Sequence, residues 1–335
     1  MLERILIVGL GSIGTRHARL IRELMPDVHI IALRHRNQPD NVAPPIDSCV
    51  TSLDEALRLG PQAAVIASPS SYHLEVAFPL AQAGVDLLVE KPIADTTRRV
   101  SELIDVCRSH EIVLMTGYNL RFLPCLQRFR ELLEKNTIGR VLSVRAEVGQ
   151  FLPSWRAGCD YRKSVSAQAA LGGGALLELS HEIDYLRWLF GEVGWVSAVQ
   201  SRQSGLDIDV EDTVYLILGF TQASGDVPVI GTLNMDFVRH DTTRVCTAIG
   251  ETGSLRWNAV AGSVEIFEKG GTAWQTLFTH QQQRDESYRV ELRHFLKCVK
   301  ERASPIVSGN DGLAVLRIIE AARHSSFSRA VVAIK

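Results

Sequence analysis

The sequence predicts an α/β domain built on a doubly wound parallel sheet, followed by an α+β domain with a mostly antiparallel open sheet. In the first part of the chain, short runs that are apolar on both faces alternate with helical patterns, as in buried parallel sheets. Farther along, strand patterns follow one another without helices between them, which indicates antiparallel pairing. We expect the first domain at 1–122 and the second at 123–335, with the C-terminal helix able to pack back on the first.

The composition excludes several classes of protein. The chain of 335 residues has the length of two domains, and 46% of its residues are hydrophobic, as expected for a protein with a real core. A formal net charge of −2, without a long Lys/Arg run, indicates neither nucleic-acid nor membrane-surface binding. No apolar run approaches the ~20 residues of a membrane helix. The first strand pattern begins near Glu3, so we expect no signal peptide.

The six cysteines are far apart and form no CxxC pair. This spacing favours reduced thiols in a cytoplasmic protein over a disulfide framework or a zinc site. Because no His and Cys ligands cluster in the sequence, we expect no bound metal.

The first domain is expected to alternate strand and helix. The run RILIV at 4–8 predicts the first strand, and a glycine-rich turn leads from it into a helical pattern at 15–24. Ser52 is the expected N-cap of a short helix. Further strands are expected at 29–33, 63–68, 87–90 and 112–117, and further helices at 52–59, 72–83 and 96–109.

The second domain begins with a helix near 123–135 and a half-exposed strand at 139–151, where apolar and polar residues alternate. A single helix is expected at 175–190, after a loop at 153–168. Further strands are expected at 195–202, 212–220, 227–238, 243–250, 254–258, 262–268 and 273–279, and terminal helices at 285–302 and 311–324.

The first strand runs directly into a GxGxxG turn formed by Gly9, Gly11 and Gly14, with Ser12 and Ile13 between them. The first glycine permits the tight turn, the second allows close approach of a pyrophosphate, and the third lets helix and strand pack closely. In this strand–turn–helix context the motif predicts a dinucleotide-binding domain.

The cofactor preference is expected to depend on the end of the second strand. An NAD-binding domain usually has an acidic residue there for the ribose hydroxyls, whereas this chain has Arg34, followed by Arg36. Two guanidinium groups suit a 2′-phosphate, so we expect NADP to be favoured over NAD. The alternative is that both arginines are solvated loop residues.

The stretch LLVEKP places Glu90, Lys91 and Pro92 at the end of a buried strand. Side chains at the carboxyl end of a parallel strand face the crevice where the cofactor binds, so Lys91 is expected to point there. A partly desolvated lysine exchanges protons nearer neutral pH, and the proline fixes the local backbone. Alone, the motif is better explained by a solvated lysine at a strand end.

Four motifs occur in this order along the first domain and are informative in combination: GxGxxG, ASPSSYH at 67–73, EKP at 90–92 and GYNLRF at 117–122. This combination resembles the glucose–fructose oxidoreductase/inositol dehydrogenase family, also called Gfo/Idh/MocA. The segment GGGALLELSHEIDYLRWLFG at 172–191 is similar to the family's second-domain motif, so the resemblance covers essentially the whole chain. It also looks like the branch often associated with bacterial surface-polysaccharide pathways.

The resemblance implies a Rossmann domain that binds NAD(P), and hydride transfer at a secondary alcohol or ketone of a sugar, sugar nucleotide or polyol. It further implies a homodimer or homotetramer built through the open sheet. In the family, EKP contains the catalytic lysine, usually with a cis peptide before the proline. Lys91 is therefore the implied general acid/base, and Glu90 helps to set its environment.

The resemblance also implies that His181 lines the substrate site and assists catalysis. Glu178, His181 and Asp184 are spaced by three, which would place them on one helix face. Many relatives have an aspartate four residues before this histidine, but that position here is Leu177 and the nearest acid is Glu178. The alternative for His181 is a helix histidine satisfied by a neighbouring acid, and Asp184 could simply orient it.

Other matched positions have weaker functional indications. Asn119 is expected near the cofactor and Arg121 near the substrate, although Arg121 could equally pin the domain junction. Ser68, Pro69 and His73 match the family's loop beside the cofactor, where most contacts are expected to be architectural.

The loop at 153–168 is long for a compact domain, which is typical of an active-site lid. Trp155 and Tyr161 supply an aromatic platform, and Arg162 and Lys163 supply cations, as does Arg156. These residues suit an anionic sugar, such as a sugar nucleotide or sugar acid. A solvated basic loop or a subunit contact is the alternative.

The sequence therefore favours an NAD(P)-dependent oxidoreductase over two rivals. The first rival is a non-catalytic, cofactor-binding regulator of the same fold, which would have no chemical need for both Lys91 and His181. The second is a net non-redox reaction, such as epimerisation or glycoside cleavage, that uses a tightly bound cofactor.

Overall fold

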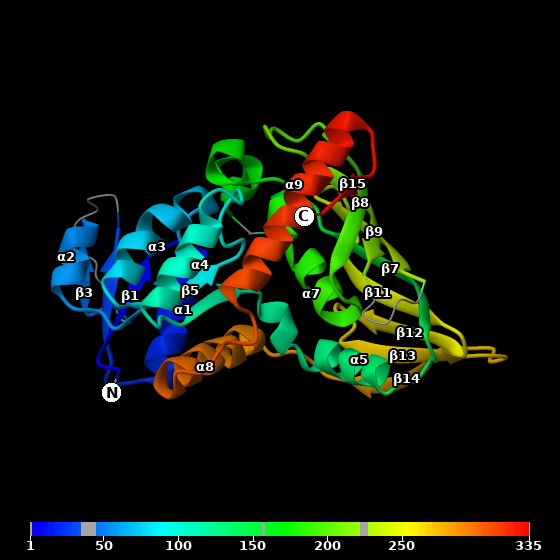
Figure 1. The fold of residues 1–335 in the computed structure, drawn as a ribbon, viewed down its shortest axis with the longest axis horizontal. Helices are drawn as coiled ribbons and strands as arrows, with labels where there is room; N and C mark the ends of the chain where they lie inside the picture. The colour runs from blue at the N-terminus through cyan, green and yellow to red at the C-terminus, as the bar shows by residue number, and fades with distance from the viewer. Residues whose placement is uncertain (1, 35–44, 156–157, 222–226, 335) are drawn as a thin grey trace. The chain divides into compact units, whose positions relative to one another are not determined.

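The computed structural model describes residues 2–34, 45–155, 158–221 and 227–334. Contacts within the chain divide it into two compact units. The first unit comprises Met1–Asn119 and Asp285–Leu316, and the second comprises Leu120–Arg284 and Arg317–Lys335. In Figure 1 most of the first unit is blue to cyan, and most of the second is green to yellow.

The first unit contains a six-stranded sheet in which every strand pair is parallel, with the order β3-β2-β1-β4-β5-β6. This confirms the doubly wound sheet that the buried apolar runs predict. The edge strand β3 was not predicted, because a three-residue strand gives no periodic signal. The strands are β1 (Arg4–Val8), β2 (His29–Leu33), β3 (Ser48–Val50), β4 (Ala63–Ile66), β5 (Asp86–Glu90) and β6 (Leu114–Gly117).

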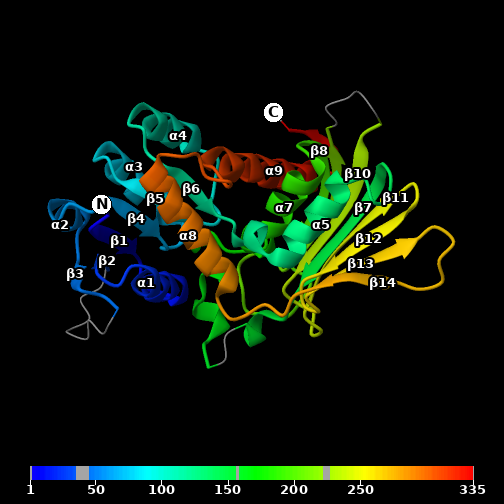
Figure 2. The ribbon, with the colours of Figure 1, turned by 90° about the horizontal axis from the view of Figure 1, so that it is seen from below.

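Helices cover this sheet. The Ser52 side chain accepts a hydrogen bond from the backbone N–H of Glu55, which completes a capping box and confirms Ser52 as an N-cap. Helices α1 and α8 lie against each other although more than 260 residues separate their starts (Figure 2). The helices of the unit are α1 (Ser12–Leu24), α2 (Leu53–Arg58), α3 (His73–Gln82), α4 (Val100–Ser109), α8 (Glu286–Glu301) and the first part of α9 (Gly309–Ser328).

The second unit contains a nine-stranded sheet with the order β14-β13-β12-β11-β7-β10-β9-β8-β15. Among the described strands of this sheet, only the β7–β10 pair is parallel, which confirms the mostly antiparallel sheet. The strands are β7 (Val141–Gly149), β8 (Val193–Ser201), β9 (Thr213–Phe220), β10 (Val229–Asp236), β11 (Thr243–Gly250), β12 (Gly253–Asn258), β13 (Ser263–Glu268), β14 (Gln275–Thr279) and β15 (Val332–Ala333).

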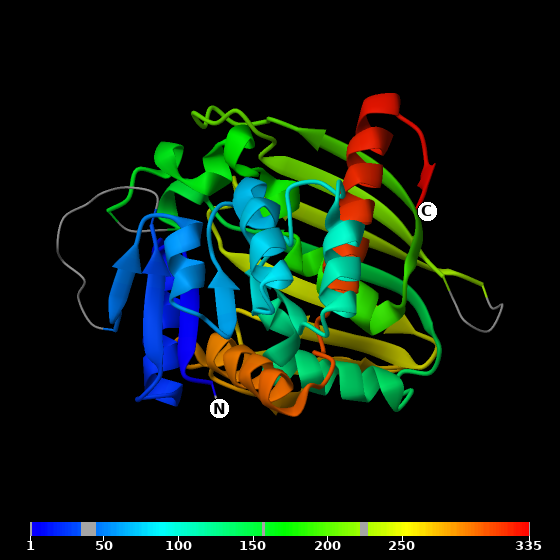
Figure 3. The ribbon, with the colours of Figure 1, turned by 60° about the vertical axis from the view of Figure 1, so that its left-hand side comes forward.

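Helices pack on one face of this larger sheet (Figure 3). α5 (Pro124–Glu134) lies against β12, β13 and β14, and the short α6 (Ala175–Glu178) lies against β9 and β10. The opposite face exposes apolar side chains at alternate strand positions, among them Tyr215 and Ile217 of β9. The sheet is therefore open on that side, as the alternating sequence pattern predicts.

The single helix expected at 175–190 is wrong. The structure has two helices there, α6 and α7 (His181–Phe190), separated by a tight turn at Leu179 and Ser180. The Ser180 N–H reaches back only three residues, to the carbonyl of Leu177, and Leu179 has φ −96° and ψ 20°. Because local turn geometry interrupts the helical periodicity, Glu178 ends one helix while His181 starts the next.

Two negative findings apply to the described residues. None of their helices is both long enough and apolar enough to cross a membrane. Within the same ranges, no group of three or more His, Cys, Asp or Glu side chains is arranged to hold a metal ion.

Candidate active site

The turn between β1 and α1 requires two of its three glycines for reasons internal to the protein. Gly9 has φ +86°, and a Cβ there would lie 3.0 Å from the carbonyl oxygen of Ala67. A Cβ on Gly14 would lie 1.9 Å from the carbonyl oxygen of Gly9. A side chain is therefore disfavoured at both positions, at Gly9 by its positive φ and the backbone after β4, and at Gly14 by the backbone of the turn itself.

Gly11 is different. Its φ of −69° and ψ of −169° suit any residue, and a Cβ there would meet no described atom within 4 Å. The folded protein therefore does not itself require glycine at this position. A ligand that approaches the backbone closely would require it, because a side chain would stand in its way. Ser12 and Ile13 form the first turn of α1, whose free N–H groups and positive dipole end favour an anion. This cradle fits the pyrophosphate of a dinucleotide.

We predict opposite effects for alanine at two of these glycines. Gly11→Ala should leave thermal stability unchanged or raise it by about 0.4–1 kcal/mol, because its backbone conformation suits alanine. It should weaken dinucleotide affinity at least ~10-fold, because the methyl group enters the phosphate cradle. Gly14→Ala should destabilise the protein by about 1–3 kcal/mol through overpacking. Calorimetric melting and dinucleotide titration measure both quantities, and unchanged affinity in Gly11→Ala would contradict the assignment.

Arg34 follows β2 directly, and its backbone N–H donates to the carbonyl oxygen of Val50 at 3.0 Å. The side chain is half-buried. Arg36, the second arginine predicted for the 2′-phosphate, lies outside the described residues. The structure thus fixes the position of one of the two predicted cations.

The loop after β4 contains Ser68, Pro69 and His73. The His73 ring is buried, with Nε2 at 2.8 Å from the carbonyl oxygen of Ser68 and Nδ1 at 3.0 Å from that of Pro92. Burial lowers the pKa of His73 below its ordinary value. The neutral ring has one N–H and can donate to only one of these two carbonyl oxygens. Because the ring lies between them, His73 joins this loop to the EKP segment and shapes the site. In contrast, the Ser68 hydroxyl is buried without a hydrogen-bond partner among the described residues, which fits a cofactor contact.

Lys91 follows the last residue of β5 and is half-buried. The peptide bond between Lys91 and Pro92 is cis. Glu90 is buried, and its Oε2 accepts the backbone N–H of Lys91 at 3.2 Å. Its Oε1 lies 2.6 Å from Nε2 of His17 on α1. Burial disfavours the ionised carboxylate, but the His17 hydrogen bond and the nearby charges outweigh it, and the pKa of Glu90 is lowered.

The contact between Glu90 and His17 was not predicted, although a signal was available. His17 lies three residues after Gly14, in the buried stripe of α1 that also contains Ala18 and Ile21. A histidine inside an otherwise small or apolar stripe needs a polar partner. Sequence alone does not identify that partner, which lies 73 residues away.

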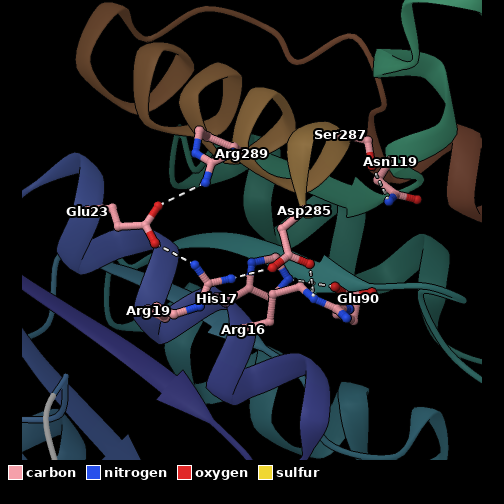
Figure 4. Close-up of polar contacts among 9 residues, drawn as sticks. All are labelled: Arg16, His17, Arg19, Glu23, Glu90, Asn119, Asp285, Ser287 and Arg289. Carbon is pink, nitrogen blue, oxygen red and sulfur yellow. Dashed lines mark hydrogen bonds and ion pairs between the residues drawn. The ribbon is translucent and has the colours of Figure 1, made fainter. Parts of the chain in front are cut away.

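Asn119 is buried at the end of the Rossmann-type segment. Its side-chain amide donates to the hydroxyl of Ser287 in α8 at 3.0 Å (Figure 4). This bond orients the Asn119 side chain, although its partner Ser287 is 168 residues away in the sequence. A cofactor contact by Asn119 stays a prediction.

In the second unit, Arg121 and Asp184 form a buried ion pair. The Arg121 guanidinium donates to both carboxylate oxygens of Asp184, at 2.9 and 2.5 Å, and both side chains are at most 4% exposed. The guanidinium also lies over the Trp188 ring, 5.8 Å from its centroid. Arg121 and Asp184 were both predicted to bind substrate, and they instead bind each other. This pairing supports a positioning role for the two side chains.

The remaining helix residues are less buried. His181 begins α7 and is half-buried. Glu178 ends α6, and its Oε2 accepts a hydrogen bond from the Ser166 hydroxyl at 2.9 Å. The break between the helices separates Glu178 from the face shared by His181 and Asp184, so the prediction of one common helix face is wrong for Glu178.

A cavity of about 340 Å³ lies in the loop predicted to be a lid. Trp155 and Tyr161 contribute aromatic rings to its wall and Lys163 contributes a cation. Arg162 is instead paired with Asp160 in its own loop, at 2.8 Å. The sequence reasoning missed the polar wall residues Asp160, Ser164 and Ser166, because hydroxyl and carboxylate side chains are unremarkable in a loop. The lining residues are Leu152, Pro153, Trp155, Cys159, Asp160, Tyr161, Lys163, Ser164 and Ser166.

Comparison with known proteins agrees with this geometry. A family model described as "Oxidoreductase family, NAD-binding Rossmann fold" matches residues 3–118, and its companion, "Oxidoreductase family, C-terminal alpha/beta domain", matches residues 130–334. The chain belongs to the Gfo/Idh/MocA oxidoreductase family. The resemblance noted in the sequence motifs is thereby confirmed.

Gfo/Idh/MocA proteins of known activity are similar along the whole chain. The myo-inositol 2-dehydrogenase of Thermotoga maritima is 26% identical over 337 residues, covering 96% of each chain. A levoglucosan dehydrogenase in complex with NADH has the same fold, with a TM-score of 0.86, 23% identity and 99% coverage of each chain. The WlbA dehydrogenase of Bordetella pertussis, in complex with NADH and UDP-GlcNAcA, also has this fold, with a TM-score of 0.83 and 23% identity. The match covers 100% of this chain and 99% of that chain.

Family and fold together establish the general activity. The protein is an NAD(P)-dependent oxidoreductase that acts on CH–OH groups, in the class of sugar and polyol dehydrogenases. Residues 3–118, within the first unit, form the NAD-binding Rossmann domain.

Proposed function

We propose that this enzyme interconverts a secondary alcohol and its ketone on a sugar, sugar nucleotide or polyol, with Lys91 as general acid/base and NADP as the favoured cofactor. When bound, the nicotinamide supplies hydride acceptance and return. Lys91 takes the hydroxyl proton during oxidation and gives it back during reduction. His181 orients the reacting oxygen or assists the proton transfer.

One observation supports this function above the others. Adjacent parallel strands β1, β4 and β5 end at the same edge of the sheet, with the glycine turn after β1, Ser68 after β4 and Lys91 after β5. Two strand spacings amount to about 10 Å. A cofactor-binding turn and a half-buried amine backed by a carboxylate therefore share one rim, which is where parallel sheets bind ligands.

The cavity in the second unit supports a polyhydroxylated substrate. Its wall combines two aromatic rings with hydroxyl, carboxylate and ammonium groups, which suit the apolar faces and hydroxyls of a sugar ring. Lys163 is compatible with an anionic sugar, and a structural neighbour, WlbA, has UDP-GlcNAcA bound. Arg162 contributes less positive charge than predicted, because Asp160 compensates it.

The NADP preference depends on Arg34. The half-buried arginine stands where NAD-binding domains usually have an acid, and a guanidinium there suits a 2′-phosphate. The structural neighbours described above contain NADH, so cofactor choice has to be measured on this chain.

The test is absorbance at the nicotinamide band, with NAD and NADP each supplied against sugar nucleotides, sugar acids, free sugars and inositols. We expect turnover with at least one class, and a higher kcat/KM with NADP. Arg34→Ala should weaken NADP binding about 10–100-fold, the loss of one or two charge-assisted hydrogen bonds, and should leave NAD binding nearly unchanged. Equal affinity for both cofactors before and after the change would refute the preference.

If no compound of the panel changes the absorbance at the nicotinamide band, and tight cofactor binding is demonstrated separately, net redox turnover is contradicted. That result would favour the regulator or the non-redox reaction instead. Cofactor that stays bound through purification, with product formed but no net absorbance change, would identify the latter.

Two further properties are proposed with the function. A second copy of the chain covers the open face of the large sheet, because Val199, Tyr215, Ile217 and Ile230 together expose an apolar surface there. Sedimentation equilibrium measures the oligomeric state, and a monomer at micromolar concentration would refute this proposal.

The enzyme works in the cytoplasm, where its six unpaired cysteines stay reduced.

A further inference from the structure

Glu90 is held on both of its oxygens. Oε1 lies 2.6 Å from His17 Nε2, and Oε2 accepts the Lys91 N–H at 3.2 Å. Gly117 of β6 leaves room for the carboxylate, since a Cβ there would lie 3.1 Å from Oε2. The carboxylate thus lies between α1 and β6, against the backbone N–H of Lys91.

His17 is completely buried, and the environment of its ring decides how it binds Glu90. Its Nδ1 has no hydrogen-bond partner among the described residues. An imidazolium would leave a buried N–H at Nδ1 unsatisfied, which costs about 1–3 kcal/mol. The neutral ring with its proton on Nε2 buries a lone pair at Nδ1 instead of an N–H. In that tautomer His17 donates to an ionised Glu90, and the pair keeps one negative charge.

Helix α8 fixes the ring of His17 from the other side. The Tyr288 ring meets it edge-on, with centroids 5.8 Å apart. Arg16 lies over the same tyrosine at 4.6 Å and pairs with Asp285 at 2.8 Å. Arg19 also pairs with Asp285, and Glu23 pairs with Arg289 at 3.0 Å (Figure 4). These ring contacts and ion pairs therefore hold the turn of α1 that contains His17 against α8 and the residue that precedes it.

We propose that His17 is a positioning residue for the lysine chemistry: it holds Glu90 ionised against the Lys91–Pro92 segment and ties that segment to α1, the helix that begins at the phosphate-binding turn. The inference rests on the proposed role of Lys91. The Glu90 carboxylate acts on Lys91 in two ways: it interacts with the amine by charge, and it accepts the backbone N–H of the same residue. The charged or titratable groups that act on Glu90 from the surrounding elements are His17, Lys91 and His73.

The first test needs no substrate. Competitive acylation with acetic anhydride at a series of pH values, followed by peptide mass spectrometry, measures the pH at which Lys91 becomes half reactive. Exposed Lys269 in the same protein is the internal reference. His17→Leu should lower the Lys91 midpoint, because a buried Glu90 that has lost this hydrogen bond ionises less readily and presents less negative charge beside the lysine. His17→Gln, which restores a donor near the Nε2 position, should return most of the shift.

A double-mutant cycle with Glu90→Gln isolates the pair. If His17 acts through Glu90, the double variant should show the same midpoint as Glu90→Gln alone. Additive shifts, or an unchanged midpoint in His17→Leu, would overturn the proposal. His110→Leu, at an exposed histidine of the same unit, is the matched control and should leave the midpoint unchanged.

The second test uses turnover, once a substrate is known. The pH profile for alcohol oxidation should move to lower pH in His17→Leu, by the same amount as the acylation midpoint, while NADP affinity stays within ~3-fold. A lower melting temperature with an unmoved profile would mean that His17 is purely structural. If no substrate is turned over, the proposed function fails while the acylation test still judges the His17–Glu90 coupling.

Discussion

Replacing Lys91 by alanine is expected to reduce kcat about 10²–10⁴-fold, the usual contribution of a general acid/base, and to leave cofactor affinity nearly intact. The physical reason is that the Lys91 amine is the proposed proton carrier, whereas the cofactor phosphates are bound by the turn after β1. Steady-state kinetics at the nicotinamide band and cofactor titration of the same preparation measure the two quantities.

Lys91→Arg is the matched control for charge. Arginine keeps the positive charge but does not give up its proton in proteins, so this variant should be as inactive as the alanine variant if proton transfer is the function. Activity retained with arginine would mean that Lys91 acts only as a fixed charge. A parallel loss of turnover and of cofactor binding would show instead that the lysine is structural.

Breaking the buried pair between Arg121 and Asp184 is expected to have the largest effect on stability. Arg121→Ala removes the guanidinium that pairs with the buried Asp184 carboxylate, which should lower the free energy of unfolding by about 3–5 kcal/mol. Replacing both partners, as Arg121→Met with Asp184→Leu, should recover most of this loss, because no buried charge then remains.

Tryptophan fluorescence is well suited to this measurement, because all five tryptophans lie at or after Trp155 and within the second unit. Urea unfolding followed at this signal therefore reports on the unit that contains the pair. If Arg121 were mainly a substrate ligand, Arg121→Ala would raise KM at unchanged stability. That outcome would restore the substrate-binding role predicted from the sequence.

Local patterns in the sequence determined much of this protein. Apolar runs such as 4–8 and 29–33 are long and buried enough to specify parallel strands, and the three-residue edge strand Ser48–Val50 is too short to give the same signal. The Ser52 capping box and the glycines of the phosphate turn follow from local chemistry, because each acts on atoms only a few residues away. These features could be predicted for the same reason.

Only the tertiary structure decided which polar groups meet. His17 and Glu90 are 73 residues apart, Arg121 and Asp184 are 63 apart, and nothing in their neighbouring residues specifies the partner. The interruption between Glu178 and His181 also escaped the sequence pattern, because three-residue spacing persists across a turn that ends the helix. Hydrophobic periodicity determines which face of an element is buried, whereas the pairing of buried charges depends on how those faces are packed together.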